Sequence, residues 1–210
     1  MKKVFLLCIF IIFLTGCTSI KNSDLDVLVN EVVASNVNIL NVNKSGYRYY
    51  LPKGFSLVSS DNYNEVITNH KYNIYLYVDI VSYNNRTNFN YNINKKAYYS
   101  RNLGNKDKKG YIEINNYEKD KYLIEIMYNY AKIEVMVFQE DIKEIVTYVM
   151  SIISSITYND NVIKNTLSSS RLDEFEESFN IFEIVGSDNY LQFSEEVVTD
   201  DRVKDPDYVN

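Results

Sequence analysis

Two segments of the chain carry apolar residues three and four positions apart, which places them on one face of a helix. The first, residues 24–35, follows Ser23 and has an acid at Asp26, a pair typical of a helix N-terminus. The second, residues 141–156, has an apolar face of seven aliphatic residues: Ile142, Ile145, Val146, Val149, Ile152, Ile153 and Ile156. We expect this second helix to cover the apolar face of a sheet.

Between these helices the apolar period falls to two, which predicts strands. The expected strands are 47–51, 55–58, 65–69, 72–83, 97–103, 111–115, 122–130 and 132–138. Pro52 and Gly54 predict a turn that joins the first two as a hairpin, and short turns join the last three as a meander. The pattern predicts an α+β domain, an antiparallel sheet flanked by helices.

The strand predicted at 72–83 has one purely apolar face and one aromatic face. The aromatic face carries Tyr75, Tyr77, Asp79 and Tyr83, and Tyr111 or Tyr128 could extend it. If exposed, this face would be a binding platform for a peptide or a glycan. The alternative is that a helix covers it, and the segment 24–35 is the expected cover.

Several acids on the predicted strands are candidates for chemistry. Asp79 is either a buried acid or cation ligand, or it pairs with Arg86 or a backbone donor on the sheet. Glu113, Glu125 and Glu134 lie on neighbouring strands, where two of them could form an acid pair for glycan cleavage. The competing interpretation is that glutamates on a strand face are solvated.

The N-terminal segment has the features of a targeting signal. Lys2 and Lys3 precede an apolar run, residues 4–14, too short to span a membrane and suited to a secretory signal. The run ends in Leu14-Thr15-Gly16-Cys17, which resembles the bacterial lipobox. The resemblance implies cleavage between Gly16 and Cys17 and diacylation of Cys17, with palmitate as a typical acyl chain. A plain secretion signal with an accidental cysteine is the alternative.

Two acyl chains on one residue would hold the protein on the extracytoplasmic face of the cell membrane. The chain then divides into a lipoprotein signal peptide at 1–16, a tether at 17–23, the helix at 24–35, a domain at 46–162 and an extension at 163–210.

Charge is concentrated in the extension. The whole chain has a net charge of -6, and residues 164–210 hold 12 acids against 4 bases. This balance argues against a nucleic-acid partner. The extension also contains apolar segments at 181–185 and 190–193, which would dock either on the protein's own sheet or on a partner. Its acids, including Asp200, Asp201, Asp205 and Asp207, match no calcium-loop spacing.

The sequence offers little catalytic chemistry. Its single histidine, His70, lies in a polar turn, and the chain keeps no free cysteine if Cys17 is acylated. No glycines have the spacing of a nucleotide-binding loop. We therefore expect no cofactor, no metal site and no catalytic residues.

Two short motifs support a resemblance over residues 46–159, about half of the chain. They are Tyr50-Leu51-Pro52-Lys53-Gly54-Phe55 and Ser154-Ser155-Ile156-Thr157-Tyr158-Asn159. The segment resembles the PsbP-like fold group, which includes the LpqN and DcrB types of bacterial lipoprotein. The resemblance implies an antiparallel sheet flanked by helices and carries over no catalytic residue.

These features favour a membrane-anchored, non-catalytic lipoprotein that binds or scaffolds another cell-envelope component, either protein or glycan. A carboxylate-dependent envelope hydrolase and a carrier of a small apolar ligand are the alternatives. Two acids facing an open cleft would favour the hydrolase, and a deep apolar cavity would favour the carrier.

Overall fold

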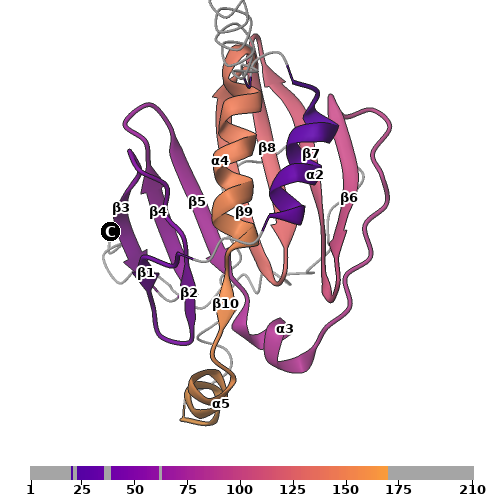
Figure 1. The fold of residues 1–210 in the computed structure, drawn as a ribbon. Coiled ribbons are helices and arrows are strands. Elements are labelled where there is room, and N and C mark those ends of the chain that lie inside the picture. The colour runs from indigo at the N-terminus through magenta and orange to yellow at the C-terminus, as the bar shows by residue number, and fades with distance from the viewer. Residues whose placement is uncertain (1–19, 21–22, 36–38, 62, 170–210) are drawn as a thin grey trace, which may run out of the picture.

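The alternating segments form two antiparallel sheets in the computed structural model, which describes residues 20, 23–35, 39–61 and 63–169 (Figure 1). The large sheet has the strand order β3-β4-β5-β9-β8-β7-β6. Its strands are β3 (Ser56–Asp61), β4 (Asn64–Thr68), β5 (Asn73–Val78), β6 (Tyr99–Asn105), β7 (Lys108–Glu118), β8 (Lys121–Tyr128) and β9 (Ala131–Phe138). The predicted α+β class with an antiparallel sheet is confirmed.

The strands β7 to β9 form the expected meander, and β6 extends it by pairing with β7. The β6–β7 connection is a tight turn, because Asn105 pairs with Lys108 and only two residues join the strands. The β8–β9 turn is equally tight, and both Asn129 and Tyr130 have positive φ, 53° and 63°. Such turns match the right-handed twist of the strands they join.

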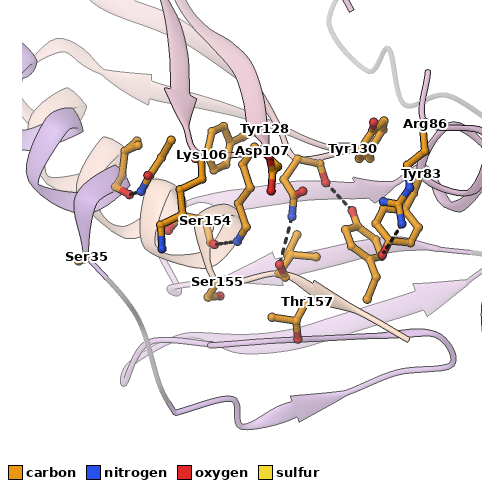
Figure 2. Close-up of a pocket in the computed structure, with 16 residues that line it drawn as sticks. Ser35, Tyr83, Arg86, Lys106, Asp107, Tyr128, Tyr130, Ser154, Ser155 and Thr157 are labelled. Atoms are coloured by element: carbon orange, nitrogen blue, oxygen red, sulfur yellow. Dashed lines mark hydrogen bonds between the residues drawn. The ribbon is translucent and has the colours of Figure 1, made fainter. Parts of the chain in front are cut away.

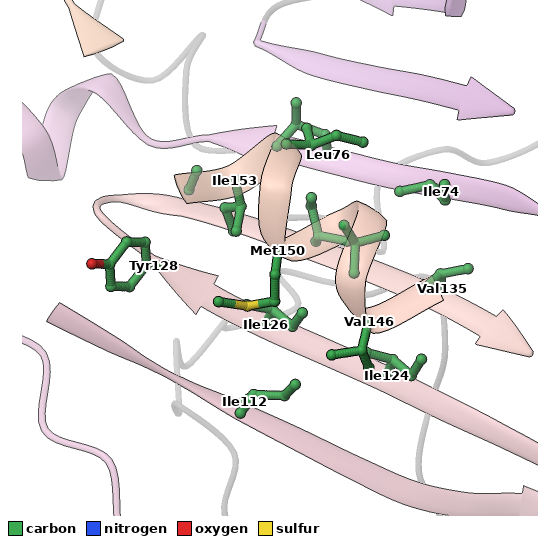
Figure 3. Close-up of a cluster of buried hydrophobic side chains, with 14 of the residues drawn as sticks. Ile74, Leu76, Ile112, Ile124, Ile126, Tyr128, Val135, Val146, Met150 and Ile153 are labelled. Atoms are coloured by element: carbon green, nitrogen blue, oxygen red, sulfur yellow. The ribbon is translucent and has the colours of Figure 1, made fainter. Parts of the chain in front are cut away.

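The helix α4 (Ile142–Ser154) covers the inner face of the large sheet, as its apolar stripe predicted. All seven aliphatic residues of that stripe are buried. Figure 3 shows Val146, Met150 and Ile153 of the helix against core residues of the sheet, among them Ile124 and Ile126. Each such side chain contributes about 1.5–3 kcal/mol when it is removed from water.

The helix α2 (Leu25–Ala34) confirms the first helical segment, but it does not cover the aromatic face. It lies beside α4 on the inner face (Figure 1), where Tyr99 and Arg101 of β6 reach its Asp26 at 2.7 and 2.9 Å. Leu25 and Val29 join the core formed with α4, which explains this placement. Asp24 rather than Ser23 caps the helix, since its carboxylate accepts the backbone N–H of Asp26.

The predicted hairpin of 47–51 and 55–58 is wrong. The strand β2 (Tyr47–Tyr49) pairs with β1 (Val42–Asn43) and β10 (Thr157–Tyr158) in a separate small sheet, whereas β3 pairs with β4. Alternation identifies strands without identifying their partners. The end of α4 directs β10 to β2, and Ser155 Oγ accepts the backbone N–H of Tyr50 at 2.9 Å.

The strand predicted at 72–83 ends early. The strand β5 stops at Val78, and residues 80–85 form the short helix α3 (Ile80–Asn85). Asp79 caps this helix, because its carboxylate accepts the backbone N–H of Ser82 at 2.7 Å. Local side-chain capping of this kind ends a strand even where the apolar period continues.

The described chain ends in helix α5 (Asp160–Ser169), which crosses the boundary expected between residues 162 and 163. Ile163 is buried and lies against Gly46, where an added Cβ would come within 2.9 Å of its Cγ1. Gly46 also has a φ of 89°, so the contact and the backbone both require glycine. The predicted signal, Cys17 and the acidic extension beyond residue 169 lie outside the described residues.

No helix within the described ranges combines the length and the apolar character needed to cross a membrane.

Candidate functional site

The four residues of the predicted aromatic face do not share one surface. Tyr75 and Tyr77 lie on the outer face of β5, half-buried, opposite Glu134 and Lys132 of β9. Tyr83 belongs to α3 and stacks on Tyr158 with ring centroids 3.9 Å apart.

Asp79 has a structural role in the cap of α3 rather than a place on the sheet. Its carboxylate accepts a backbone donor, one of the two structural alternatives for this residue, while its own N–H donates to the carbonyl of Tyr130 at 2.9 Å. Arg86 instead lies 3.8 Å from the carboxylate of Asp160.

The three glutamates on the strands form a row across the outer face of the sheet. Glu113 lies opposite Glu125, which lies opposite Glu134. Lys132 bridges Glu125 and Glu134 at 3.0 and 2.7 Å. Burial lowers the pKa of Lys132, but the two carboxylates outweigh it, so its pKa lies above the usual value. One ammonium therefore holds two neighbouring carboxylates in place.

The third acid of the row, Glu113, is held by neutral donors. Its carboxylate accepts hydrogen bonds from Tyr91, from Asn94 at 2.8 Å and from Asn115 at 2.8 Å. Tyr91 stacks on Tyr111 with centroids 4.1 Å apart and covers this end of the row.

The expectation of solvated strand glutamates is wrong for two of the three. Glu113 and Glu134 are 5% and 2% exposed. Tyr111 donates to Glu125 at 2.6 Å, and burial, followed by the charge of Glu125, raises the pKa of Tyr111. The row is thus a buried polar network whose acids already have partners.

A cleft of about 890 Å³ opens at one end of the large sheet, beside the β6–β7 and β8–β9 turns (Figure 2). The β6–β7 and β8–β9 turns, the end of α4, β10 and α3 form its walls. Figure 2 shows Tyr83, Arg86 and Tyr130 at one end of the cleft, away from Lys106 and Ser154. A second cleft of about 710 Å³ shares Tyr83 and the two residues of β10 with the first.

The aromatic end of the cleft is rigidly built around Tyr83. Its ring stacks on Tyr158, meets Tyr130 edge-on with centroids 5.6 Å apart, and carries the guanidinium of Arg86 4.2 Å from its centroid. Its hydroxyl donates to Asp160 at 2.6 Å. The favoured edge-on and cation–π geometries fix the ring without leaving its polar atom unused.

The other end of the cleft brings together Lys108, Tyr128 and Ser154. Lys108 donates to the carbonyl of Ser154 at 2.9 Å, and its half-buried position lowers the pKa of its ammonium. Tyr128 is 1% exposed, and burial raises the pKa of its phenol. Only the topology brings these three residues together, so no local motif predicts them.

Other candidate chemistry is weak in the described part of the chain. His70 lies in an exposed turn with a φ of 70°, as its polar neighbours predicted. Searched over the same residues, histidine, cysteine, aspartate and glutamate form no group of three placed to hold a metal ion.

Comparison of the chain with protein-family models, with curated proteins and with solved structures finds no match.

Proposed function

We propose that the protein is a lipoprotein anchored to the extracytoplasmic face of the cell membrane, where it binds another envelope component without catalysing a reaction. The observation that carries this proposal is the sequence Leu14-Thr15-Gly16-Cys17 at the end of an apolar run of signal-peptide length. Acylation of Cys17 would provide the two chains that stable anchoring needs.

The clefts support binding rather than catalysis. Asp107 is the only carboxylate among the described residues that line the larger cleft. Cleavage of a glycan by the usual mechanism needs two carboxyl groups on either side of the bond. The wall residues instead offer phenol rings, amides and cations, which are groups that orient a ligand.

The alternative functions have less support. The row of Glu113, Glu125 and Glu134 is the nearest approach to a hydrolase site, but Lys132 and several neutral donors already bind these acids. The larger cleft is lined mainly by polar residues, unlike the apolar cavity of a lipid or hydrophobe carrier.

The finer fold assignment is also a proposal. A PsbP-like domain of the LpqN or DcrB type agrees with the antiparallel sheet, with the covering helix α4 and with the hydrogen bond between Tyr50 and Ser155, which joins the two motifs. Fold of this kind supports no particular activity by itself.

Site-specific photocrosslinking in the native cell tests the binding function. A photoreactive residue at Lys106, on the exposed rim of the larger cleft, is expected to give one reproducible adduct. The matched control is Lys119, in the β7–β8 turn at the far end of the sheet. Equal adduct patterns from both positions, or none from either, would contradict binding at this end of the molecule.

A further inference from the structure

Lys108 is a half-buried cation without a counter-ion in the described part of the chain. Each ion pair there involves other cations, namely Lys44, Lys71, Arg86, Arg101, Lys121 and Lys132. The one hydrogen bond of Lys108 goes to the neutral carbonyl of Ser154, which uses one of its three donors. Removing an ammonium from water without a charge partner is costly.

Two residues that line the same cleft as Lys108 have hydroxyls without a hydrogen-bond partner among the described residues. Tyr128 Oη and Ser154 Oγ are buried atoms without a hydrogen-bond partner, and both residues line the larger cleft (Figure 2). Buried polar atoms nearly always have a partner, and an exception calls for an explanation. Here a half-buried cation and two residues with unpartnered hydroxyls, all able to donate, line one cleft.

Within the described ranges, the lining of the cleft carries three cations, Arg86, Lys106 and Lys108, and one carboxylate, Asp107. Lys106 and Asp107 are neighbours in the exposed turn, and Arg86 lies 3.8 Å from Asp160. Of the three cations only Lys108 is half-buried, since Arg86 and Lys106 are exposed. A carboxylate, with one negative charge and two acceptor oxygens, matches this single half-buried cation.

We infer that the larger cleft binds a small organic molecule with one carboxylate, held by the ammonium of Lys108 and the hydroxyls of Tyr128 and Ser154. The phenol rings of Tyr83 and Tyr130 at the other end provide apolar walls for the body of the ligand. This inference rests on the proposed binding function and adds a ligand class to it, independently of the membrane anchor.

Helix capping explains only part of the arrangement. A cation near the last carbonyls of α4 is favourable, and the bond of Lys108 to Ser154 provides that contact. The cap requires neither a phenol nor a serine hydroxyl without a partner. A carboxylate would satisfy both hydroxyls and the remaining donors of the ammonium at once.

Titration of the full chain in detergent micelles, followed by amide NMR, tests the inference with benzoate and its neutral analogue benzamide. Benzoate is expected to shift the amides around Lys108, Tyr128 and Ser154, and benzamide to bind at least about tenfold more weakly, since a charge-assisted hydrogen bond is lost.

Three variants complete the test. Lys108→Met is expected to weaken benzoate binding by about tenfold or more, whereas Lys109→Met, its neighbour on the outer face, leaves the affinity unchanged. Tyr128→Phe is expected to weaken binding by about threefold or more while the protein remains at least as stable, because the lost hydroxyl has no partner.

Three results would overturn the inference: equal affinities for benzoate and benzamide, equal affinities of the two lysine variants, or no shift at the cleft. Equal binding of the neutral analogue in the cleft would leave the proposed binding function standing. The separate result that counts against that function is the absence of a specific photocrosslinked adduct from position Lys106.

Discussion

Tyr49 donates a hydrogen bond of 2.5 Å to the carboxylate of Glu65 and so joins the small sheet to the large one. Tyr47, two residues earlier, donates to the other carboxylate oxygen. Glu65 is fully buried, and its remaining charge partner is Lys44 at 3.7 Å. Burial, followed by the charge of Glu65, raises the pKa of both phenols, so they remain donors at neutral pH.

Loss of this bond is expected to destabilise the fold. Tyr49→Phe should lower the free energy of unfolding by about 1.5–3 kcal/mol, since the bond is made to a buried charged group. Urea denaturation measures the change. The triple variant Tyr47→Phe, Tyr49→Phe and Glu65→Leu is the control, because it also removes the buried carboxylate that loses a donor in the single variant. A triple variant less stable than the single one would contradict this account of how the two sheets are joined.

The helix α4 is expected to be the main cover of the large sheet. Ile145→Asp and Ile152→Asp should each lower the free energy of unfolding by several kcal/mol, because an unpaired charge enters the core. Ser151→Asp, at a half-buried position of the same helix, is the control and should cost less. Unchanged melting temperatures for both isoleucine variants would show that α4 is not part of the core.

Asp26 is expected to titrate below its usual range. The hydrogen bond from Tyr99 lowers its pKa, slight burial opposes this, and Arg101 lowers it further. A carboxyl with a lowered folded pKa stabilises the protein above its unfolded value of 3.8, and this contribution disappears as the pH falls through the folded value. NMR titration of the Asp26 carboxyl in the wild type should therefore show a midpoint below 3.8.

Tyr99→Phe should move that midpoint upward, toward the usual value, because the largest lowering contribution is lost. Tyr98→Phe, an exposed neighbour, should leave it in place. If the two variants titrate alike, α2 is not fixed to β6 through this carboxylate.

The acidic extension is expected to be dispensable for the core. The core itself is expected to end with helix α5. A chain that ends after Ser169 should keep the stability of the full chain, because it retains the buried Ile163. A chain that ends after Asn159 should lose several kcal/mol with that side chain and the helix around it. Denaturant unfolding compares the two. A large loss on removal of 170–210 alone would refute dispensability.

The periodic segments were predictable, because burial on one face leaves a repeat in the sequence. The stripe of α4 and the alternation of β5, β8 and β9 identified these elements, although β5 ends earlier than predicted. The partners of β2 were not predictable, since alternation does not say which strand lies next to which. The prediction of the aromatic face was wrong from Asp79 onward, because the carboxylate of Asp79 accepts the Ser82 N–H and the strand ends there. The sequence Asp79-Ile80-Val81-Ser82 could have signalled a helix start.

The candidate site was less predictable than the fold. Lys108, Tyr128 and Ser154 come from two strands and a helix end, and only the tertiary arrangement places them on one cleft. The sequence suggested Tyr128 as a possible extension of the aromatic face, but its ring is buried in the core, in line with Ile124 and Ile126 at period two. Whether a buried hydroxyl finds a partner depends on its neighbours in space, which the period does not identify.

Acylation of Cys17 is the most direct test of the proposed anchor. Cells that express the full chain are labelled with an alkyne fatty acid, and the protein is isolated and tested for the probe and for release from the membrane by detergent. The account predicts labelling of the wild type and of Cys8→Ala, whose cysteine lies within the signal. It predicts no labelling and no membrane retention for Cys17→Ala. A Cys17→Ala protein that is still labelled and membrane-bound would contradict the account.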